Sequence, residues 1–305
     1  MTRVAAIDCG TNSIRLLVAD ADPATGELVD LDRRMTIVRL GQDVDRTGRL
    51  APEALERTFA ACRAYAEVIR EHGAERVRFV ATSASRDAEN RDDFVRGVVE
   101  ILGVEPEVIS GDQEAAFSFT GATKELGAGQ GEYLVVDIGG GSTEFVVGGA
   151  EVRAARSVDV GCVRLTERHV RHDPPSADEV AAIRADVRAA LDLAEEAVPL
   201  READTLVGLA GSVTTVAAIA LGLEEYDSAR IHHCRIPYEQ VRDISEKLLG
   251  ATHDERAAHG AMHPGRVDVI AAGALVLREV MERAGASEVV VSEHDILDGI
   301  AWSVA

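Results

Sequence analysis

The sequence predicts an α/β protein with two similar domains, because one strand–turn–strand pattern occurs twice along the chain. In the first copy, residues 3–8 and 14–19 have the apolar character of buried strands and flank a glycine-containing turn. The second copy runs from Tyr133 to Val147 and has three consecutive glycines in its turn. One such turn is weak support, but two of them a domain-length apart indicate a duplicated architecture.

The two copies align without a gap, and three positions at the turn carry the same residue in both copies. The aligned pairs are Asp8 with Asp137, Gly10 with Gly139, and Ser13 with Ser142. Each copy therefore has the order strand, aspartate, glycine turn, hydroxyl and strand. We expect each domain to present its turn to a shared cleft that holds a phosphate-bearing ligand.

The residue types in the second turn point to phosphate and metal chemistry. Glycines let backbone N–H groups approach an anion closely, and successive amides form an anion-binding nest. Ser142 and Thr143 add hydroxyl donors, while Asp137 and Glu144 bring carboxylates to the same turn. Carboxylates beside a phosphate cradle usually indicate a bridging divalent cation, because bare like charges would repel. The alternative is a glycine-rich hairpin with polar residues and no ligand.

The rest of the first domain reads as further strands and helices. Apolar residues at helical spacing predict a helix that begins at Pro52 and ends at Gly73. The other expected elements are strands over 27–33, 35–40, 77–82 and 105–109, with helices over 90–102 and from residue 115.

Two charged residues follow predicted strands at their C-terminal ends, where open α/β sheets place ligands. Arg86 is interpreted as a phosphate contact, and its alternative is an ion pair with Asp87 or Glu89. Glu114 lies at the start of the next predicted helix. It is either a carboxylate that compensates the helix dipole or a general base facing the cleft, and the residues alone leave both open.

The domain boundary is expected just before the glycine-rich linker at 127–131. We assign residues 1–122, joined by the closing helix 295–305, to an N-terminal domain and residues 123–294 to a C-terminal domain. In the latter, Ser176 and Glu179 have the pattern of a capping box that opens a helix ending near residue 197. The other expected elements are strands over 153–158, 205–210 and 287–292, with helices entered at 159–166 and over 213–221, 238–250, 266–284 and 293–302.

A third candidate anion site follows the strand expected at 205–210. Gly211 and Ser212 open a helix there, and a helix N-terminus binds anions readily. The alternative is tight packing of the helix against the strand, and both readings stand.

Composition limits the classes of function. The formal net charge of −21 argues against non-specific binding to nucleic acid or to anionic membranes. No apolar run reaches the ~18 residues that span a bilayer, and charged residues interrupt the N-terminus before a signal-peptide core, so a cytoplasmic location is expected. The cysteines are widely separated and predict free thiols: Cys9, Cys62, Cys162 and Cys234. The histidines lack convincing metal-ligand spacing.

Several motifs together resemble the Ppx/GppA phosphatase family. They are the segments 8–15, 81–87, 110–115 and 137–144, with Gly211-Ser212 and Arg266-x-Asp268-x-Ile270. The resemblance spans essentially the whole chain in the family's order. It implies two actin-like, ribonuclease H-like domains with the active-site cleft between them, in the short form without the family's additional helical domain.

The resemblance also implies roles for individual residues. Glu114 matches the catalytic base for an attacking water, and Asp137 and Glu144 match the acidic pair that holds Mg²⁺, or Mn²⁺ in its place, and orients that water. Asp8 would face the same ion from the first turn. The residues implied in phosphate binding are Thr11, Asn12, Ser13, Arg86, Gly140, Gly141, Ser142 and Thr143, with Gly211 and Ser212 as a further site. The segment 292–299 departs from the family's usual Leu-Arg-Glu-Gly ending, which puts a basic contact there in doubt.

Members of this family remove terminal phosphate from inorganic polyphosphate or from guanosine pentaphosphate. We therefore expect an exopolyphosphatase that prefers short chains, with guanosine pentaphosphate hydrolysis as the alternative and a link to the stringent response. Such hydrolysis needs positioning, charge neutralisation and an oriented water rather than a covalent intermediate. More distant alternatives are an ATP-dependent kinase of the same fold and a non-catalytic binder of guanosine tetra- or pentaphosphate. The resemblance also implies a homodimer.

Overall fold

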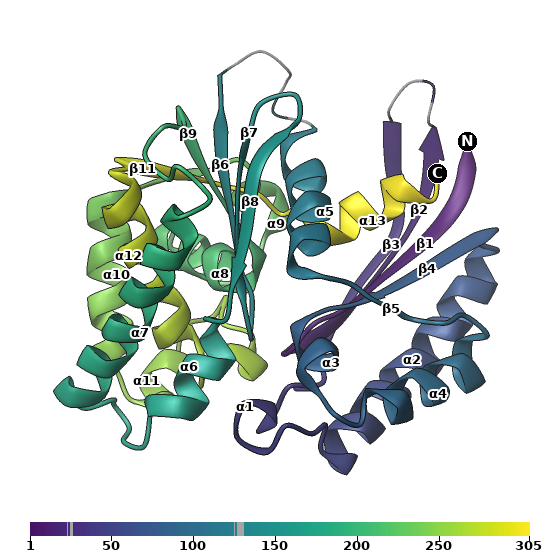
Figure 1. Ribbon diagram of the computed structural model, residues 1–305, viewed down its shortest axis with the longest axis horizontal. Helices are drawn as coiled ribbons and strands as arrows, with labels where there is room; N and C mark the ends of the chain where they lie inside the picture. The colour runs from purple at the N-terminus through teal and green to yellow at the C-terminus, as the bar shows by residue number, and fades with distance from the viewer. Residues whose placement is uncertain (23, 25–26, 125, 127–130) are drawn as a thin grey trace. The chain divides into compact units, whose positions relative to one another are not determined.

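The computed structural model describes residues 1–22, 24, 27–124, 126 and 131–305 (Figure 1). By its internal contacts the chain divides into unit 1, Met1–Gly121 with Ile296–Ala305, and unit 2, Ala122–Asp295. The sequence placed these divisions at 122 and 295. Residues 127–130 of the expected linker, and most of the turn expected at 22–26, lie outside the described residues.

Unit 1 contains a five-stranded sheet with the order β3-β2-β1-β4-β5. Its strands are β1 (Thr2–Cys9), β2 (Ser13–Asp22), β3 (Glu27–Ile37), β4 (Arg76–Ala81) and β5 (Glu107–Val108). The strands β1, β2 and β3 pair antiparallel, whereas β1, β4 and β5 pair parallel. The two strands expected over 27–33 and 35–40 were wrong, because β3 is one strand. Its irregularity is a shift in register opposite Val18 and Ala19, and Arg34 continues the ladder opposite Leu16.

The helices of unit 1 cover both faces of this sheet. They are α1 (Val44–Thr47), α2 (Pro52–His72), α3 (Ser83–Asp87), α4 (Arg91–Leu102), α5 (Gly111–Thr123) and α13 (Ile296–Ser303). Alternate residues of β1 enter different cores, as the pleat of a strand requires. Ala5 and Ile7 join a buried cluster with residues of α2 and α4, whereas Val4 and Ala6 join a cluster with α13.

The closing helix α13 is anchored to β3 by a partly buried ion pair. The Arg33 guanidinium donates to Asp298 at 2.5 and 3.3 Å, and the Asp298 side chain is 3% exposed. The helix begins at Ile296 rather than at residue 293 as expected. Ser292 still belongs to the ladder of unit 2, where its N–H donates to the carbonyl of Gly208 at 3.0 Å.

Unit 2 contains a six-stranded sheet with the order β10-β11-β9-β6-β7-β8. Its strands are β6 (Tyr133–Ile138), β7 (Thr143–Gly148), β8 (Val152–Val158), β9 (Thr205–Leu209), β10 (Arg235–Pro237) and β11 (Glu288–Val291). The order β8-β7-β6-β9-β11 repeats that of unit 1 with the same strand directions. Both units therefore have the strand order of the expected ribonuclease H-like fold, and β10 is an addition at the edge of unit 2.

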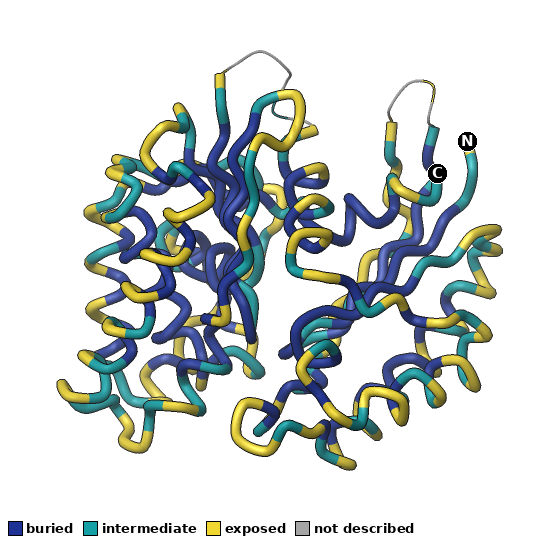
Figure 2. The backbone as a smooth tube through the Cα atoms, in the orientation of Figure 1, coloured by how far each residue is buried: buried dark blue, intermediate teal, exposed yellow. Residues whose placement is uncertain are grey.

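The helices of unit 2 pack on a large apolar core. They are α6 (Cys162–His169), α7 (Ala177–Glu195), α8 (Ala210–Ala220), α9 (Ser228–Ile231), α10 (Tyr238–Gly250), α11 (His253–Ala257) and α12 (Ile270–Ala284), with a 3-10 turn at Pro264–Arg266. The predicted capping box is present, because Ser176 and Glu179 exchange hydrogen bonds at the start of α7. The strands β6 and β7 are buried at every residue, as the dark blue tube shows (Figure 2). Of the helices described, none is long and apolar enough to cross a membrane.

Candidate active site

The hairpin of β6 and β7 places two carboxylates face to face in unit 2. Asp137 and Glu144 are direct partners in the antiparallel register, and both are buried, at 7% and 1% exposure. The Ser157 hydroxyl on β8 donates to Glu144 Oε1 at 2.7 Å. Facing carboxylates repel each other unless a positive charge compensates them. Their hard oxygen donors suit Mg²⁺, which is usually held by one or two carboxylates together with substrate phosphates.

The glycine turn between these strands is held from behind by the start of α6. The N–H groups of residues 162, 163 and 164 donate to the carbonyls of Gly139 and Gly140 at 2.9 to 3.1 Å, and Arg164 Nε donates to the Gly141 carbonyl at 2.7 Å. A Cβ on Gly161 would lie 2.4 Å from the Gly140 carbonyl carbon, so only glycine permits this approach.

The hydrogen bonds from α6 use the carbonyl groups of the glycine turn rather than its N–H groups. Gly139 N–H closes the turn on the Ser142 carbonyl at 3.0 Å, whereas the N–H groups of Gly140 and Gly141 have no protein acceptor within the described residues. Together with the neighbouring Ser142 and Thr143, these glycines have the composition expected of an anion-binding nest. The Thr143 hydroxyl is itself used inside the protein, because it donates to the Val160 carbonyl at 2.6 Å.

The hairpin of β1 and β2 in unit 1 repeats this turn with a different pair of facing side chains. Gly10 N–H closes the turn on the Ser13 carbonyl at 3.0 Å, as in the second copy. Asp8, however, faces Arg15, whose guanidinium donates to Asp8 Oδ2 at 2.7 and 3.0 Å. The Asp8 carboxylate thus faces a cation of the protein, whereas Asp137 faces a second carboxylate.

The first turn is held from behind by a loop rather than by a helix. The N–H groups of Val38 and Arg39 donate to the Asn12 carbonyl at 3.0 and 2.9 Å, and Gly41 N–H donates to the Thr11 carbonyl at 2.9 Å. The Thr11 hydroxyl also lies 2.9 Å from that of Ser83 on α3. Asn12 is 9% exposed, and its buried Oδ1 has no hydrogen-bond partner among the described residues, as expected for a group that awaits a ligand or water.

The structure brings Arg86 and Glu114 together within unit 1. Arg86 lies at the end of α3 and donates to the Ile109 carbonyl at 3.0 Å and to Glu114 Oε2 at 3.3 Å. Glu114 lies in the first turn of α5 and is 8% exposed. The ion pair of Arg86 is therefore with Glu114 rather than with Asp87 or Glu89, the partners considered in the sequence, and Glu89 pairs with Arg49 instead. Glu114 is therefore a candidate general base, because its buried carboxylate is oriented by a guanidinium.

At the third candidate site, Gly211-Ser212, the structure supports the alternative of tight packing, which the sequence left open. Ser212 is buried, and a Cβ on Gly273 would lie 2.2 Å from its hydroxyl oxygen. Burial raises the pKa of the Cys162 thiol, and a hydrogen bond with the Ser212 side chain opposes this rise. Gly211 nevertheless has a cation beside it, because a Cβ there would lie 1.2 Å from Arg266 Nη1.

The sequence missed the residues that support the turns. Ser157, Arg164 and the loop at 38–41 were not singled out, and Arg15 entered only as part of a motif. Arg15 had a visible signal, because the ungapped repeat aligns it with Glu144. The other contacts run through backbone atoms of distant segments, for which the sequence carries no such signal.

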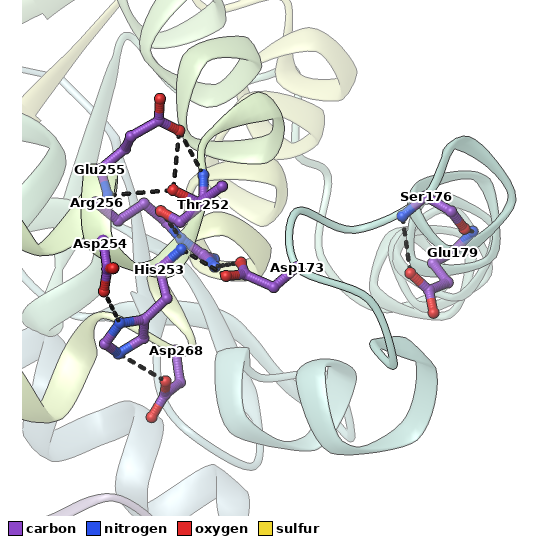
Figure 3. Close-up of polar contacts among 9 residues, drawn as sticks. All are labelled: Asp173, Ser176, Glu179, Thr252, His253, Asp254, Glu255, Arg256 and Asp268. Atoms are coloured by element: carbon purple, nitrogen blue, oxygen red, sulfur yellow. Dashed lines mark hydrogen bonds and ion pairs between the residues drawn. The ribbon is translucent and has the colours of Figure 1, made fainter.

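Histidines of unit 2 are engaged in contacts with the protein itself. The ring of His253 lies 3.4 Å from both Asp254 and Asp268, and the backbone N–H of His253 donates to Asp173 Oδ2 at 2.8 Å (Figure 3). Arg256 donates to the other oxygen of Asp173 at 2.6 Å, so this aspartate joins the loop before α7 to the start of α11. The rings of His232 and His233 stack at 3.7 Å. No group of three or more His, Cys, Asp or Glu side chains is arranged to hold a metal within the described ranges.

Comparisons with known proteins agree with these features. The model of the Ppx/GppA phosphatase family matches residues 17–304. The chain is 54% identical over 316 residues to exopolyphosphatase 2 of Mycobacterium tuberculosis, covering 100% of this chain and 99% of that protein. It is 30% identical over 305 residues to a guanosine-5'-triphosphate,3'-diphosphate pyrophosphatase of Vibrio vulnificus, covering 98% of this chain and 59% of that protein.

A solved structure supports the same fold. The crystal structure of an exopolyphosphatase-like protein matches with a TM-score of 0.94 at 44% identity, covering 99% of this chain and 97% of that one. The fold class expected from the sequence, with two actin-like α/β units, is thereby confirmed.

Proposed function

Since the chain belongs to the Ppx/GppA phosphatase family, we propose that it is an exopolyphosphatase that hydrolyses the terminal phosphoanhydride of inorganic polyphosphate. The observation that carries this proposal is the acidic hairpin, in which Asp137 faces Glu144 beside a glycine turn whose carbonyls are held by α6. The name of the relative that is 54% identical over the whole chain supports the same activity.

The acidic pair is proposed to hold Mg²⁺, with Mn²⁺ as a substitute. Asp137 and Glu144 fit such an ion because they offer buried carboxylate oxygens that face each other in the register. When bound, the ion would supply positive charge against the phosphate oxygens of the substrate. Ser157 donates to Glu144 Oε1 and so holds one side of that carboxylate in place.

The two glycine turns are proposed to bind phosphate groups. In unit 2 the N–H groups of Gly140 and Gly141 are free of protein acceptors among the described residues and would donate to phosphate oxygens. Ser142 and Thr143 complete that turn. In unit 1 the corresponding residues are Thr11, Asn12 and Ser13, and Gly211 with Ser212 is a further candidate beside Arg266.

Glu114 is proposed to accept the proton of the attacking water. Arg86 lies 3.3 Å from Glu114 Oε2 and would keep that carboxylate oriented while its positive charge also favours a nearby phosphate. Direct attack by water needs no covalent intermediate, because positioning and charge stabilisation account for most of such catalysis. The catalytic role of Glu144 would be indirect, because with Asp137 it would hold the ion that supplies positive charge.

The test is a phosphate-release assay with Mg²⁺ across polyphosphate chain lengths, guanosine pentaphosphate and ATP. We expect release from polyphosphate that chelation of the metal abolishes and that needs no acceptor molecule. Glu114→Gln should lower kcat about 10³-fold, as loss of a general base does. Full phosphate release by this variant at saturating substrate would overturn the role of Glu114, and transfer only to an acceptor would indicate a kinase.

Guanosine pentaphosphate hydrolysis is the second candidate, and the similarity to the Vibrio vulnificus pyrophosphatase favours it. Polyphosphate and guanosine pentaphosphate both present a terminal phosphoanhydride. Adding each compound to an assay of the other's hydrolysis measures how strongly it competes and so decides which substrate is preferred. Tight binding of guanosine tetra- or pentaphosphate without turnover would instead support a regulator. Comparable rates on chains of hundreds of units and on short oligomers would contradict the proposed preference for short chains. The homodimer remains a prediction that light scattering tests.

A further inference from the structure

The loop at residues 38–42, between β3 and α1, forms the back of the first glycine turn. Three backbone N–H groups of this loop donate to the carbonyls of Thr11 and Asn12, at 2.9 to 3.0 Å. A Cβ on Gly41 would lie 2.3 Å from Thr11 Cγ2, so the two segments are in close contact. The direction of the Thr11 and Asn12 peptide groups therefore depends on where the loop lies.

One arginine on α2 holds this loop. Arg57 Nε donates to the Val38 carbonyl at 2.8 Å, and Nη2 donates to Gln42 Oε1 at 3.0 Å and to the Arg39 carbonyl at 3.5 Å. The planar guanidinium thus contacts both ends of the loop at once, which a single ammonium group does less well.

The loop itself needs such support. Arg39 has a φ of 49° and Asp43 has a φ of 61°, so two residues with side chains adopt the left-handed region. Such conformations cost on the order of 1 kcal/mol each and persist where the surroundings enforce them. The contacts that enforce the conformation of Arg39 include the bond from Arg57 to its carbonyl and the bond from its own N–H to the Asn12 carbonyl.

We propose that Arg57 is a positioning residue for phosphate binding. By fixing the loop at 38–42, it fixes the carbonyls of Thr11 and Asn12 and thereby aims the N–H groups of the first turn at a phosphate of the substrate. Arg164 has the equivalent task in unit 2, where it donates directly to a carbonyl of the second turn. The inference rests on the proposed function, because it takes the first turn as a phosphate site.

The test compares Arg57→Ala with Arg63→Ala as the matched control. Arg63 lies on the same helix, but its bonds at 3.4 and 3.5 Å reach only the exposed Glu56. We expect Arg57→Ala to raise KM for tripolyphosphate roughly fivefold with a smaller change in kcat, because a displaced binding group weakens substrate binding. Arg63→Ala should leave both constants unchanged.

A second readout does not depend on turnover. Hydrogen exchange at the amides of Val38, Arg39 and Gly41 should become about tenfold faster in Arg57→Ala, because the loop opens more often. Calorimetry should show a matching loss of affinity for tripolyphosphate. Arg57→Lys, which keeps one donor toward the Val38 carbonyl, should restore part of each effect and serves as the working variant if Arg57→Ala does not fold.

The outcomes separate the inference from the proposed function. If the wild-type protein releases no phosphate but Arg57→Ala still loses affinity for tripolyphosphate, the proposed function fails and the inference stands. Unchanged KM, affinity and amide exchange in Arg57→Ala would overturn the inference. A lower kcat with unchanged KM and affinity would also overturn it, because Arg57 would then support the fold alone.

Discussion

The two hairpin turns share a backbone and differ in the charge they place beside it. Each turn closes with the same 3.0 Å hydrogen bond, from Gly10 to Ser13 in unit 1 and from Gly139 to Ser142 in unit 2. The residue that faces the aspartate shared by the two copies is arginine in the first hairpin and glutamate in the second. One duplicated element thus carries two kinds of facing pair, an aspartate with an arginine in the first hairpin and two carboxylates in the second.

The largest loss of activity is expected when the second hairpin loses one of its two facing carboxylates. Glu144→Gln keeps the shape of the side chain and its neighbour Ser157 but removes one of the two facing charges. We expect phosphate release to fall about 10²- to 10³-fold, since less metal is held and less charge is neutralised. Steady-state assays over a range of Mg²⁺ concentrations measure this loss. Ser157→Ala is the milder companion variant, and equal activity of Glu144→Gln and wild type would remove the metal from the proposal.

The first hairpin is expected to depend on its ion pair for stability. In Arg15→Gln the Asp8 carboxylate, whose side chain is 6% exposed, loses the guanidinium that faces it. Breaking a largely buried pair from one side should cost about 3 kcal/mol in the free energy of unfolding. Urea denaturation measures this value. The double variant Asp8→Asn with Arg15→Gln should recover much of the loss, and a purely additive double variant would show that the two residues do not interact.

The two glycines that contact the turns from behind should differ in how well they tolerate replacement by alanine. Gly161→Ala would place Cβ 2.4 Å from backbone atoms of Gly140, whereas Gly41→Ala would meet the Thr11 side chain at 2.3 Å. A backbone must move as a unit but a threonine can change its rotamer, so Gly161→Ala should cost about 2 kcal/mol and Gly41→Ala less. Thermal unfolding and phosphate release provide the measurements. A larger effect from Gly41→Ala would reverse the expected order.

The smallest effect is expected far from both turns, at the capping box of α7. Hydrogen bonds from the Ser176 N–H, the His172 side chain and the Arg171 N–H hold the pKa of Glu179 at about 2, below its ordinary value of 4.5. The contribution of this carboxylate to stability is therefore full above pH 4.5 and is lost as the pH falls toward 2. In Glu179→Gln the thermal midpoint should depend less on pH in that interval, and phosphate release should be unchanged. Asp178→Asn, in the same helical turn, is the control, and an equal effect there would contradict the role of the cap.

Much of the fold follows from patterns that the sequence displays openly. The apolar segments and glycine turns predicted the strands of both hairpins, and the spacing from Ser176 to Glu179 predicted a cap that the structure contains. The single strand β3 was misread as two, because its charged residues at 32–34 resemble a turn although they continue the ladder. Propensity does not register a strand that is stabilised chiefly by its neighbour.

Less of the candidate site than of the fold could be predicted from the sequence. The glycines, hydroxyls and carboxylates were identified because their combination in one turn suits phosphate and metal binding. The segments that hold the turns were not, because the loop at 38–41 and the start of α6 act through backbone N–H groups that every residue except proline possesses. The pairing of Arg86 with Glu114 joins two helices that are distant in sequence, and no periodicity connects them.

The position of α13 also bears on the order in which the chain folds. Val4, Ala6 and Leu17 are covered by the last ten residues, which leave the ribosome only after the whole of unit 2 has been made. During synthesis this face of the first sheet stays open to chaperones or to premature association. Unit 2, by contrast, is one continuous segment and can complete its sheet without waiting for a distant piece of chain. We therefore expect vectorial folding to finish in reverse order, with the unit that is begun first being closed last.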